Sequence, residues 1–497
     1  MQRTLQSASR RQRPQRAFAL LAILVFIMLL SMLTVSLMFR SQSDENAAAA
    51  AGGAEQAWAA AMSGVQEAIR VAASAAPGSL DWQDNPVLFR DRPVFEDGAD
   101  HWFFTVYSPT GSEETVELRY GLQDEASRVN LNHPGYADLS KIPRMTPPMV
   151  QAVRQVIGGT LPLPGVSTNA PAEGDTTEGA SAGSVALLEA AVSSLDLPLH
   201  QGPLASVDEL ARVPGFSWDL VQGEDANSNG HLDPNEDDGD EHFPPDNHDG
   251  HLDHGMGQYF TVLSSDPDRT SQGRRRTNLN DPKEPLPAGD FPAAFTNFVA
   301  ALREAKMKLG HPADLLDRKI RVKDAQGNEV EVTSGITANE LPVVLDLFTT
   351  STEPRHEGLI NLNTASAQVL ATLPGIEPAL AETIVSTRTS VNPSRRTTTA
   401  WLLQEGVVDA EKFRALAPHL TARASQFRFQ VLGYGVPSGR FCILQVMVDV
   451  AGDEPRILAL RDLTRLGLPF TPGTGTNEPP ARQTSFVGSR AGGVRHG

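Results

Sequence analysis

Residues 225–236 carry the side chains of this chain that are best suited to bind a metal ion. Their sequence, DANSNGHLDPNE, matches the calcium-loop pattern D-x-[DN]-x-[DN]-G-x5-E at every constrained position. Gly230 would permit the sharp turn, and the oxygen ligands would be Asp225, Asn227, Asn229, the His231 carbonyl, Asp233 (directly or through water) and Glu236 (bidentate). Hard oxygen ligands favour Ca²⁺ over softer transition metals. No helical pattern follows Glu236, so we expect a fixed structural ion rather than a sensor; the alternative is a solvated acidic loop.

A second acidic cluster follows and leaves a second calcium ion open. It contains Asp246, Asp249 and Asp253, but its loop register fails because Pro245 stands at the first position and Met256 at the twelfth. Three further acids could complete it: Asp237, Asp238 and Asp240. Four histidines lie nearby, at positions 242, 248, 251 and 254. Their spacing fits no tetrahedral zinc pattern, so we expect solvated side chains.

Composition and motifs argue against an enzyme. The sequence has no G-x-S-x-G, no H-E-x-x-H and no phosphate loop, and its remaining histidines, such as His311 and His356, are isolated. We therefore expect no catalytic residues and no small-molecule substrate. The net charge of −18 disfavours nucleic acid as a partner. The single cysteine, Cys442, lies in an apolar run and is expected to be a core residue.

The N-terminal region predicts a membrane-spanning helix. Residues 17–39 are 23 consecutive residues without a charge, and a helix of this length spans about 35 Å, enough for the hydrocarbon core. Five arginines precede the run and two acids follow it, which favours a cytoplasmic N-terminus and an exported remainder. The run is too long for a signal peptide. Beyond it, the spacing of Trp58, Met62, Val65 and Ile69 predicts that the helix continues with one apolar face, broken only at Gly52-Gly53. Simple anchoring is the alternative.

The rest of the chain predicts an α+β protein with an interrupted antiparallel sheet. Alternating apolar residues predict a hairpin over 101–108 and 114–125 and further strands over 426–436, 440–450 and 455–463. About 300 mainly helical residues separate the two groups. The expected regions are a basic cytoplasmic leader (1–17), the membrane helix with its extension (18–75), the first part of the sheet domain (76–126), a helical insertion subdomain with the calcium loop (127–275), a second helical subdomain (276–424), closing strands (425–465) and a disordered tail (466–497).

The insertion contains a short internal repeat. The triplet Asn-Leu-Asn occurs in RVNLNHPG (128–135), RTNLNDPK (276–283) and LINLNTAS (359–366). The third copy continues as a helix, a Leu-Pro-Gly-Ile turn and a second helix, and residues 139–157 and 204–223 are related. We therefore expect two subdomains of helix-hairpin-helix or SAM-like type. Residues 158–184 lack periodicity and are expected to be a loop.

Four features in this order resemble the minor pseudopilin K family of bacterial type II secretion: the basic leader before the apolar helix, DEASRVNLN, INLNTASAQVLATLPGIEPALAETIV and the closing strands. The resemblance implies a pilin-like fold with a long N-terminal transmembrane helix and a calcium-binding helical insertion. It also implies leader removal by a prepilin peptidase between Ala17 and Phe18, with methylation of the new N-terminus, although the family usually has Gly where Ala17 stands. Ala22 stands where most pilins carry Glu, which this family lacks.

The resemblance implies a location and partners as well. The protein would be a single-pass inner-membrane protein with a periplasmic head. It would initiate or cap the pseudopilus tip together with minor pseudopilins I and J and the inner-membrane secretion platform, for export of folded proteins. One alternative is a membrane-anchored helix-hairpin-helix DNA-binding protein of competence type. Glu377 beside the turn and the lack of a basic stripe beyond Arg274–Arg276 oppose it. A calcium-stabilised type IV pilus tip or adhesin is the other alternative.

Overall fold

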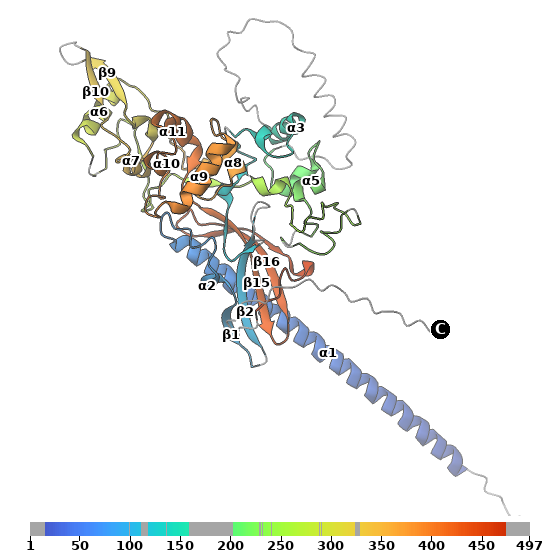
Figure 1. Ribbon diagram of the computed structural model, residues 1–497. Helices are drawn as coiled ribbons and strands as arrows, with labels where there is room; N and C mark the ends of the chain where they lie inside the picture. The colour runs from blue at the N-terminus through green and yellow to red at the C-terminus, as the bar shows by residue number, and fades with distance from the viewer. Residues whose placement is uncertain are drawn as a thin grey trace, which may run out of the picture.

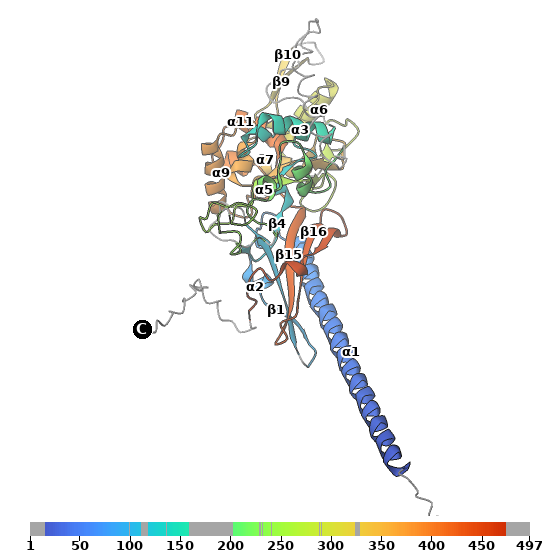
Figure 2. The same ribbon diagram turned by 90° about the vertical axis from the view of Figure 1, so that its right-hand side faces the viewer.

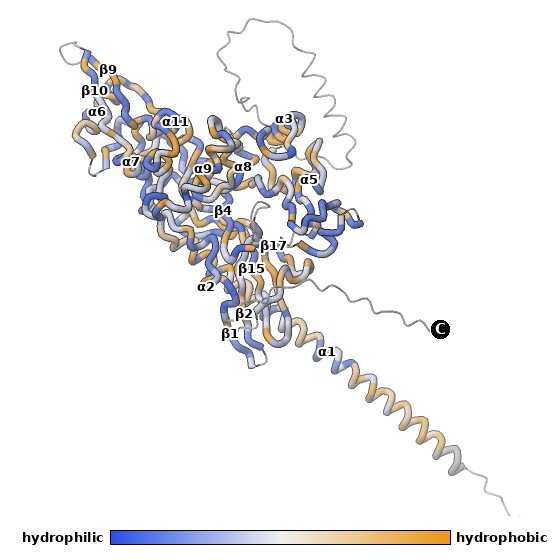
Figure 3. The backbone as a smooth tube through the Cα atoms, viewed as in Figure 1, coloured by the Kyte–Doolittle hydropathy of each residue, from blue (hydrophilic) through white to orange (hydrophobic). Residues whose placement is uncertain are grey.

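The computed structural model describes residues 15–98, 100–110, 118–135, 137–158, 202–227, 230, 232–239, 241–287, 289, 291–323 and 329–473. Its most prominent element is α1 (Gln15–Ser74), one continuous helix of 60 residues. The first half projects away from the rest of the molecule, and the second half lies on a sheet (Figures 1 and 2). Apolar residues dominate the projecting half (Figure 3). By length and composition it is the one helix among the described residues that could cross a membrane.

A seven-stranded antiparallel sheet forms the body beside α1, so the fold is mixed α+β. Its order is β1-β2-β15-β16-β17, with β3 paired to β2 and β4 paired to β15. The bounds are β1 Arg92–Glu96, β2 His101–Pro109, β3 Leu118–Arg119, β4 Gln123–Asp124, β15 Gln426–Val436, β16 Phe441–Asp449 and β17 Arg456–Asp462. Strands from the two ends of the chain are therefore neighbours, because β15 pairs with β2 along seven residues from Gln430↔Tyr107 to Val436↔His101.

The predicted hairpin is formed only in part. β3 pairs with β2 at two positions, Ser108↔Arg119 and Pro109↔Leu118, and residues 111–117 lie outside the described residues. The chain then leaves β2, and β4 pairs with β15 instead. The main partners of β2 are β1 and β15, because β15 supplies a longer apolar strand than the short segment after the turn.

The core between α1 and the sheet depends on small helix residues. Ala57, Ala61 and Ala68 of α1 are fully buried with Val65, and they pack on strand residues such as Phe429. The helix is uninterrupted at Gly52-Gly53. The predicted apolar face is buried at Val65 and partly buried at Met62 and Ile69, but Trp58 is 49% exposed and alanines make the closest approach to the sheet. Small residues occupy the buried face because they let the helix axis approach the strands closely.

The opposite face of the sheet carries a second, smaller cluster. Tyr107, Leu432 and Tyr434 are buried there, and Phe470 packs edge-on against Tyr107 with ring centroids 5.2 Å apart. η7 (Thr464–Leu466) precedes this contact. The chain is therefore ordered through Gly473, which corrects the expected start of the disordered tail at residue 466; residues 474–497 lie outside the described residues.

The insertion between β4 and β15 is built from short elements. Its first part has η1 Glu125–Ser127, β5 Val129–Asn130, η2 Leu139–Lys141, α3 Pro147–Ile157, η3 Val207–Arg212, α5 Trp218–Gln222, η4 Met256–Tyr259, β6 Phe260–Thr261 and β7 Ser265–Pro267. The second has β8 Thr277–Asn278, α6 Ala293–Glu304, η5 Pro312–Leu315, β9 Lys319–Lys323, β10 Glu329–Thr333, α7 Leu341–Leu347 and β11 Phe348–Thr349. The third has β12 Arg355–Glu357, β13 Ile360–Asn361, α8 Ala367–Ala371, α9 Pro378–Ser390, α10 Trp401–Gln404, α11 Ala410–Leu416, η6 Ala417–His419 and β14 Leu420–Thr421. The helix α2 (Pro86–Phe89) lies before the sheet.

Each Asn-Leu-Asn copy closes one of these three parts. In each copy, the first Asn and the residue before it form a two-residue strand. This strand pairs in parallel with a later two-residue strand that ends in Thr: β5 with β6, β8 with β11 and β13 with β14. The second Asn of each copy bonds backbone across the closure. Asn280, for example, donates to the carbonyls of Leu309 at 3.0 Å and Thr350 at 3.2 Å and accepts from the Leu309 amide at 2.9 Å. The insertion is therefore three closed segments, where the sequence predicted two subdomains.

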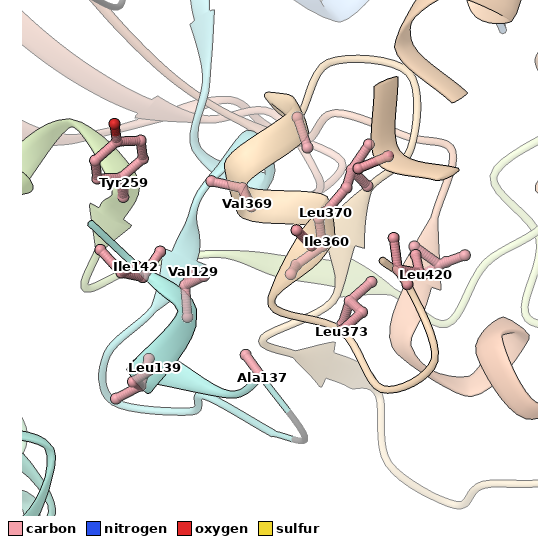
Figure 4. Packing of buried hydrophobic residues seen from close by; sticks show 14 of the residues in the cluster. Val129, Ala137, Leu139, Ile142, Tyr259, Ile360, Val369, Leu370, Leu373 and Leu420 are labelled. Carbon is pink, nitrogen blue, oxygen red and sulfur yellow. The ribbon is translucent and has the colours of Figure 1, made fainter. Parts of the chain in front are cut away.

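The cores divide the insertion in another way. Residues of the second segment such as Leu279, Phe295 and Phe348 form their own cluster. The first and third segments share one cluster, in which Val129, Leu139 and Ile142 pack near Ile360 and Val369 (Figure 4). Four residues of the second segment also belong to it: Ala313, Leu316, Leu341 and Leu345. The expected boundary at residue 275 therefore separates segments but not cores.

Candidate metal centre

The loop 225–236 is folded on itself by its own side chains. Asp225 Oδ2 accepts a hydrogen bond from the Gly230 amide at 2.9 Å, and Asn227 Nδ2 donates to Asp233 Oδ2 at 2.7 Å. Gly230 has a φ of +74°, a conformation that favours glycine. Asn229 and His231, two of the predicted ligands, lie outside the described residues. The described part therefore has the reversal that the calcium-loop pattern requires.

Glu236 closes this loop from the inside. It is fully buried, and its two oxygens accept from the amides of Ala226 at 2.9 Å and Asp233 at 3.0 Å. Burial raises the pKa of the Glu236 carboxyl to about 7, with the like charges of Asp225 and Asp233 adding to the effect and the two amide bonds opposing it. A buried carboxylate between two others is costly without a cation. The donor set and its charge thus fit a hard divalent cation.

The second acidic cluster is arranged differently from the expectation. Among the described residues, one group of three metal-capable side chains has ligand atoms within 4.8 Å of one another: Asp237, Asp246 and His248. Asp249 accepts from the His251 amide at 2.8 Å. Asp253 pairs with Arg144 at 2.9 Å. The structure therefore joins Asp246 to Asp237 and not to Asp249 or Asp253.

The histidines near the loop differ in their surroundings. His242, His248 and His251 are exposed, as expected, although His248 belongs to the group just described. His254 is partly buried, and burial lowers its pKa to about 4. The expectation of a solvated side chain is therefore wrong for His254. Sequence reasoning also assigned no site role to His248, and its spacing from Asp237 carries no motif that could have found it.

The acidic region is attached to both the sheet and the insertion. Gly230 lies against Pro109 at the end of β2, where an added Cβ would come within 2.8 Å of the proline Cβ. Glu224 accepts from the amides of Asn247 at 3.4 Å and Asp253 at 3.1 Å, which links the two loops. A cation bound here would therefore stiffen the junction of insertion and sheet.

The remaining sequence predictions concern isolated positions. Ala17 and Phe18 lie in the first turns of α1, in a stretch whose side chains are outside the described residues. Cys442 is buried, as expected, and burial raises the pKa of its thiol. His311 is one of the isolated histidines; burial lowers its pKa to about 4.

Comparisons with known proteins give limited matches. A helix-hairpin-helix motif matches residues 356–421, the part that contains α8, the Leu373–Ile376 turn and α9. No curated protein matches the chain. A similar solved structure is the crystal structure of the GspK-GspI-GspJ complex from the type 2 secretion system of enterotoxigenic Escherichia coli. The similarity spans 85% of this chain and 99% of that one at 11% identity, with a TM-score of 0.24. A likeness this weak establishes neither a shared fold nor a shared function.

Proposed function

We propose that this protein is a minor-pseudopilin-like subunit of a type II secretion system, held in the inner membrane by α1 with its N-terminus in the cytoplasm and its head in the periplasm. The observation that carries the proposal is the division of α1. From Leu21 to Phe39 its side chains are exposed, whereas from Ala57 to Ala72 one face is buried in the sheet core. One rigid helix thus joins an apolar rod to an α+β head.

The rod requires an apolar environment along its whole surface. Leu24, Phe26 and Met28 are 61%, 65% and 66% exposed, and apolar area of this extent is unfavourable in water. Lipid and the helices of neighbouring subunits both satisfy it. Ala22 leaves this stretch of the helix without a carboxylate that would need a partner in lipid.

The position of the insertion supports a place at the end of an assembly. In Figures 1 and 2 it lies beyond the sheet, at the opposite end from the free half of α1. A filament built by lateral packing of such helices would be covered by this bulk on its distal side. The proposed role is initiation or capping of the pseudopilus for export of folded proteins, with I- and J-type minor pseudopilins and the secretion platform as partners.

The proposal includes two modifications of the protein and its cofactor. A prepilin peptidase would cut between Ala17 and Phe18, and the new N-terminus would be methylated. Ca²⁺ would bind the loop from Asp225 to Glu236, and a second ion would bind near Asp246. No catalytic activity and no small-molecule substrate are part of the proposal. Mass spectrometry of the mature protein tests the cleavage, since an intact leader would contradict it.

Co-purification tests the assembly role. Full-length tagged protein, extracted in mild detergent, should carry the I- and J-type minor pseudopilins of the same cell. The matched control replaces residues 18–39 with an unrelated polyleucine span, which keeps the anchor and the head. The chimera should lose the partners. Equal recovery with both spans, or recovery with neither, would remove the proposed role of α1.

The helix-hairpin-helix match supports DNA binding as a second candidate function. In such units hairpin amides contact phosphate. Here Lys141 donates to the carbonyls of Ala371 at 2.9 Å and Ile376 at 3.4 Å beside the turn. The exposed Glu377 opposes an anion there, and Arg276 is largely buried beside Asp268. Salt-dependent retention of duplex DNA that is lost on Lys141→Ala would favour this candidate over the first.

A further inference from the structure

The side chain of Arg128 is a buried cation without a partner among the residues that the structure describes. Its residue is 8% exposed, its Nε has no hydrogen-bond partner, and its guanidinium makes no hydrogen bond or ion pair in the described part of the chain. Burial lowers its pKa to about 10, so it remains charged at neutral pH. A charge held in this way is costly unless something compensates it.

The neighbouring charges are already paired with other groups. Arg428 Nε donates to Glu125 Oε1 at 2.8 Å, and Thr261 donates to the other oxygen of Glu125. Asp124 accepts from Asn361 at 2.7 Å, Thr364 at 2.6 Å and the Ala126 amide at 3.0 Å. Neither carboxylate is within ion-pair distance of Arg128.

Arg128 lines a cavity of about 100 Å³ whose other polar residues are one further arginine, one aspartate and several amides and hydroxyls. The polar residues of the lining are Arg119, Gln83, Gln123, Gln258, Ser127, Tyr259, Thr364 and Ser366. The hydroxyls of Ser127 and Thr364 already donate to Asp124, whereas the Ser366 hydroxyl only accepts, from the Val369 amide. Asp124 is the one carboxyl in that lining, and both its oxygens already accept hydrogen bonds. Tyr259 lies at the edge of the hydrophobic cluster, with its hydroxyl pointing away from Val129 and Ile142 (Figure 4).

The chemistry of the lining selects an anion. Water would fill about three positions in this volume and satisfy donors, but it would bring no negative charge to the guanidinium, whose neighbouring carboxylates are bonded to other groups. A cation would meet Arg119 and Arg128. The planar fork of an arginine matches two oxygens of a tetrahedral oxyanion, and neutral amides and hydroxyls complete its hydrogen bonds.

We propose that the cavity beside Arg128 binds a small tetrahedral oxyanion of the phosphate or sulfate class. The oxyanion accepts from the Arg128 guanidinium, with the side-chain amides of Gln83 and Gln123 and the hydroxyl of Ser366 as further donors. Arg128 also lines a neighbouring cavity that reaches Asp225 and Gly230 of the acidic loop, so the two sites adjoin each other. The proposal does not depend on the secretion role.

The place of the cavity gives the anion a structural effect. Its walls come from the segment after α1 (Gln83), from β3 and β4, from η4 of the first insertion segment and from the start of the third (Thr364, Ser366). An ion held by all of them opposes their separation. Binding to the folded state alone raises the stability of the folded protein in proportion to the logarithm of ligand concentration.

Equilibrium dialysis of the full-length protein in detergent with radiolabelled sulfate tests the proposal directly. Saturable binding of about one sulfate per chain is expected, with competition by inorganic phosphate and none by chloride at matched ionic strength. Absence of saturable binding of both oxyanions, which would leave a cavity filled by water only, overturns the proposal.

Variants then locate the binding. Arg128→Met should abolish sulfate binding, and Arg128→Lys, which keeps the charge but loses the fork, should weaken it about tenfold or more. The thermal midpoint of the parent should rise by a few degrees in sulfate relative to chloride beyond the rise seen for Arg128→Met, since sulfate also stabilises proteins by exclusion. If Arg128→Met does not fold, the sulfate affinity of Arg128→Lys tests the assignment to Arg128. Unchanged affinity in that variant overturns the assignment to Arg128.

Discussion

Asn361 donates a hydrogen bond from its side-chain amide to the buried carboxylate of Asp124 at 2.7 Å, across 237 residues of sequence. Asp124 ends β4, the last strand before the insertion, and Asn361 belongs to the third Asn-Leu-Asn copy. The bond therefore joins the start of the insertion to its last segment. Thr364 of the same copy donates to the same oxygen at 2.6 Å, so two donors of the last segment hold one carboxylate oxygen.

This junction should make stability depend on pH. Burial raises the pKa of Asp124 from 3.8 to about 7, against the opposing effect of its hydrogen bonds. The folded protein therefore binds a proton more tightly than the unfolded chain between about pH 4 and 7. The contribution of Asp124 protonation to the free energy of unfolding is fully present below about pH 4 and is lost as pH rises to about 7. The free energy of unfolding falls by at most about 1.4 kcal/mol per pH unit in this range.

Urea unfolding from pH 4 to 8 in saturating calcium measures this effect. The free energy of unfolding of the parent minus that of Asp124→Asn should fall with pH across this window. Asp81→Asn, which changes an exposed aspartate, should run parallel to the parent. Parallel curves for Asp124→Asn as well would show that this carboxyl does not titrate there.

A second prediction concerns the approach of α1 to the sheet. Gly433 of β15 lies directly under the helix, where an added Cβ would meet the backbone of Ala57 and Ala61, with the Ala61 Cα at 2.9 Å. Backbone cannot move aside as a flexible side chain can. Gly433→Ala should therefore destabilise the head by about 1–3 kcal/mol.

Gly52→Ala is the matched control for this prediction. Gly52 lies on α1 with nothing within 4 Å of the added Cβ, so alanine should leave stability unchanged or raise it by up to about 1 kcal/mol through helix propensity. The denaturant midpoints of both variants test this prediction. A loss in Gly52→Ala equal to that in Gly433→Ala would mean that glycine is needed for another reason.

The large elements of this fold follow from sequence patterns. The uncharged run and the alternation in QFRFQVLGYGV predict α1 and β15, because burial on one side imposes a period on many residues. The predicted face of α1 is wrong at Trp58, because packing distance favours the small side chains of Ala57 and Ala61 beside the sheet, whereas Met62 packs on the core as predicted. Side-chain size, and not hydrophobicity alone, decided that contact.

The smallest elements could not be predicted in the same way. β5 and β6 are two residues each, and their paired residues Val129 and Phe260 are 131 positions apart in the sequence. No periodicity exists in two residues, although the repeated Asn-Leu-Asn signals that three segments are built alike. The same limit applies to the acidic region. The calcium pattern is contiguous, whereas Asp237, Asp246 and His248 are brought together by a fold without a motif.

A third prediction follows from the second asparagine of each copy. Asn280 satisfies three backbone groups, and Asn132 does the same for Leu204 and Val262. Asn280→Ala should cost about 2–4 kcal/mol, because three groups lose their partner. Hydrogen exchange should accelerate within residues 277–350 first. Asn339→Ala, at an exposed position, is the control, and a uniform acceleration over the whole head would contradict closure of separate segments.

The last prediction concerns calcium and protons at Glu236. Because burial raises the pKa of this carboxyl to about 7 in the ion-free loop, a proton and Ca²⁺ compete for it. Calcium affinity should rise between pH 6 and 7.5, with up to one proton released per ion. Isothermal titration in two buffers of different ionisation enthalpy measures that number. Glu236→Gln should lose at least tenfold in affinity together with the proton release, while Glu241→Gln, which removes a charge from an exposed neighbour, should keep both. Tight calcium binding by Glu236→Gln with unchanged proton release would move the ion away from this loop, and Asp246→Asn would then test the cluster with Asp237 and His248.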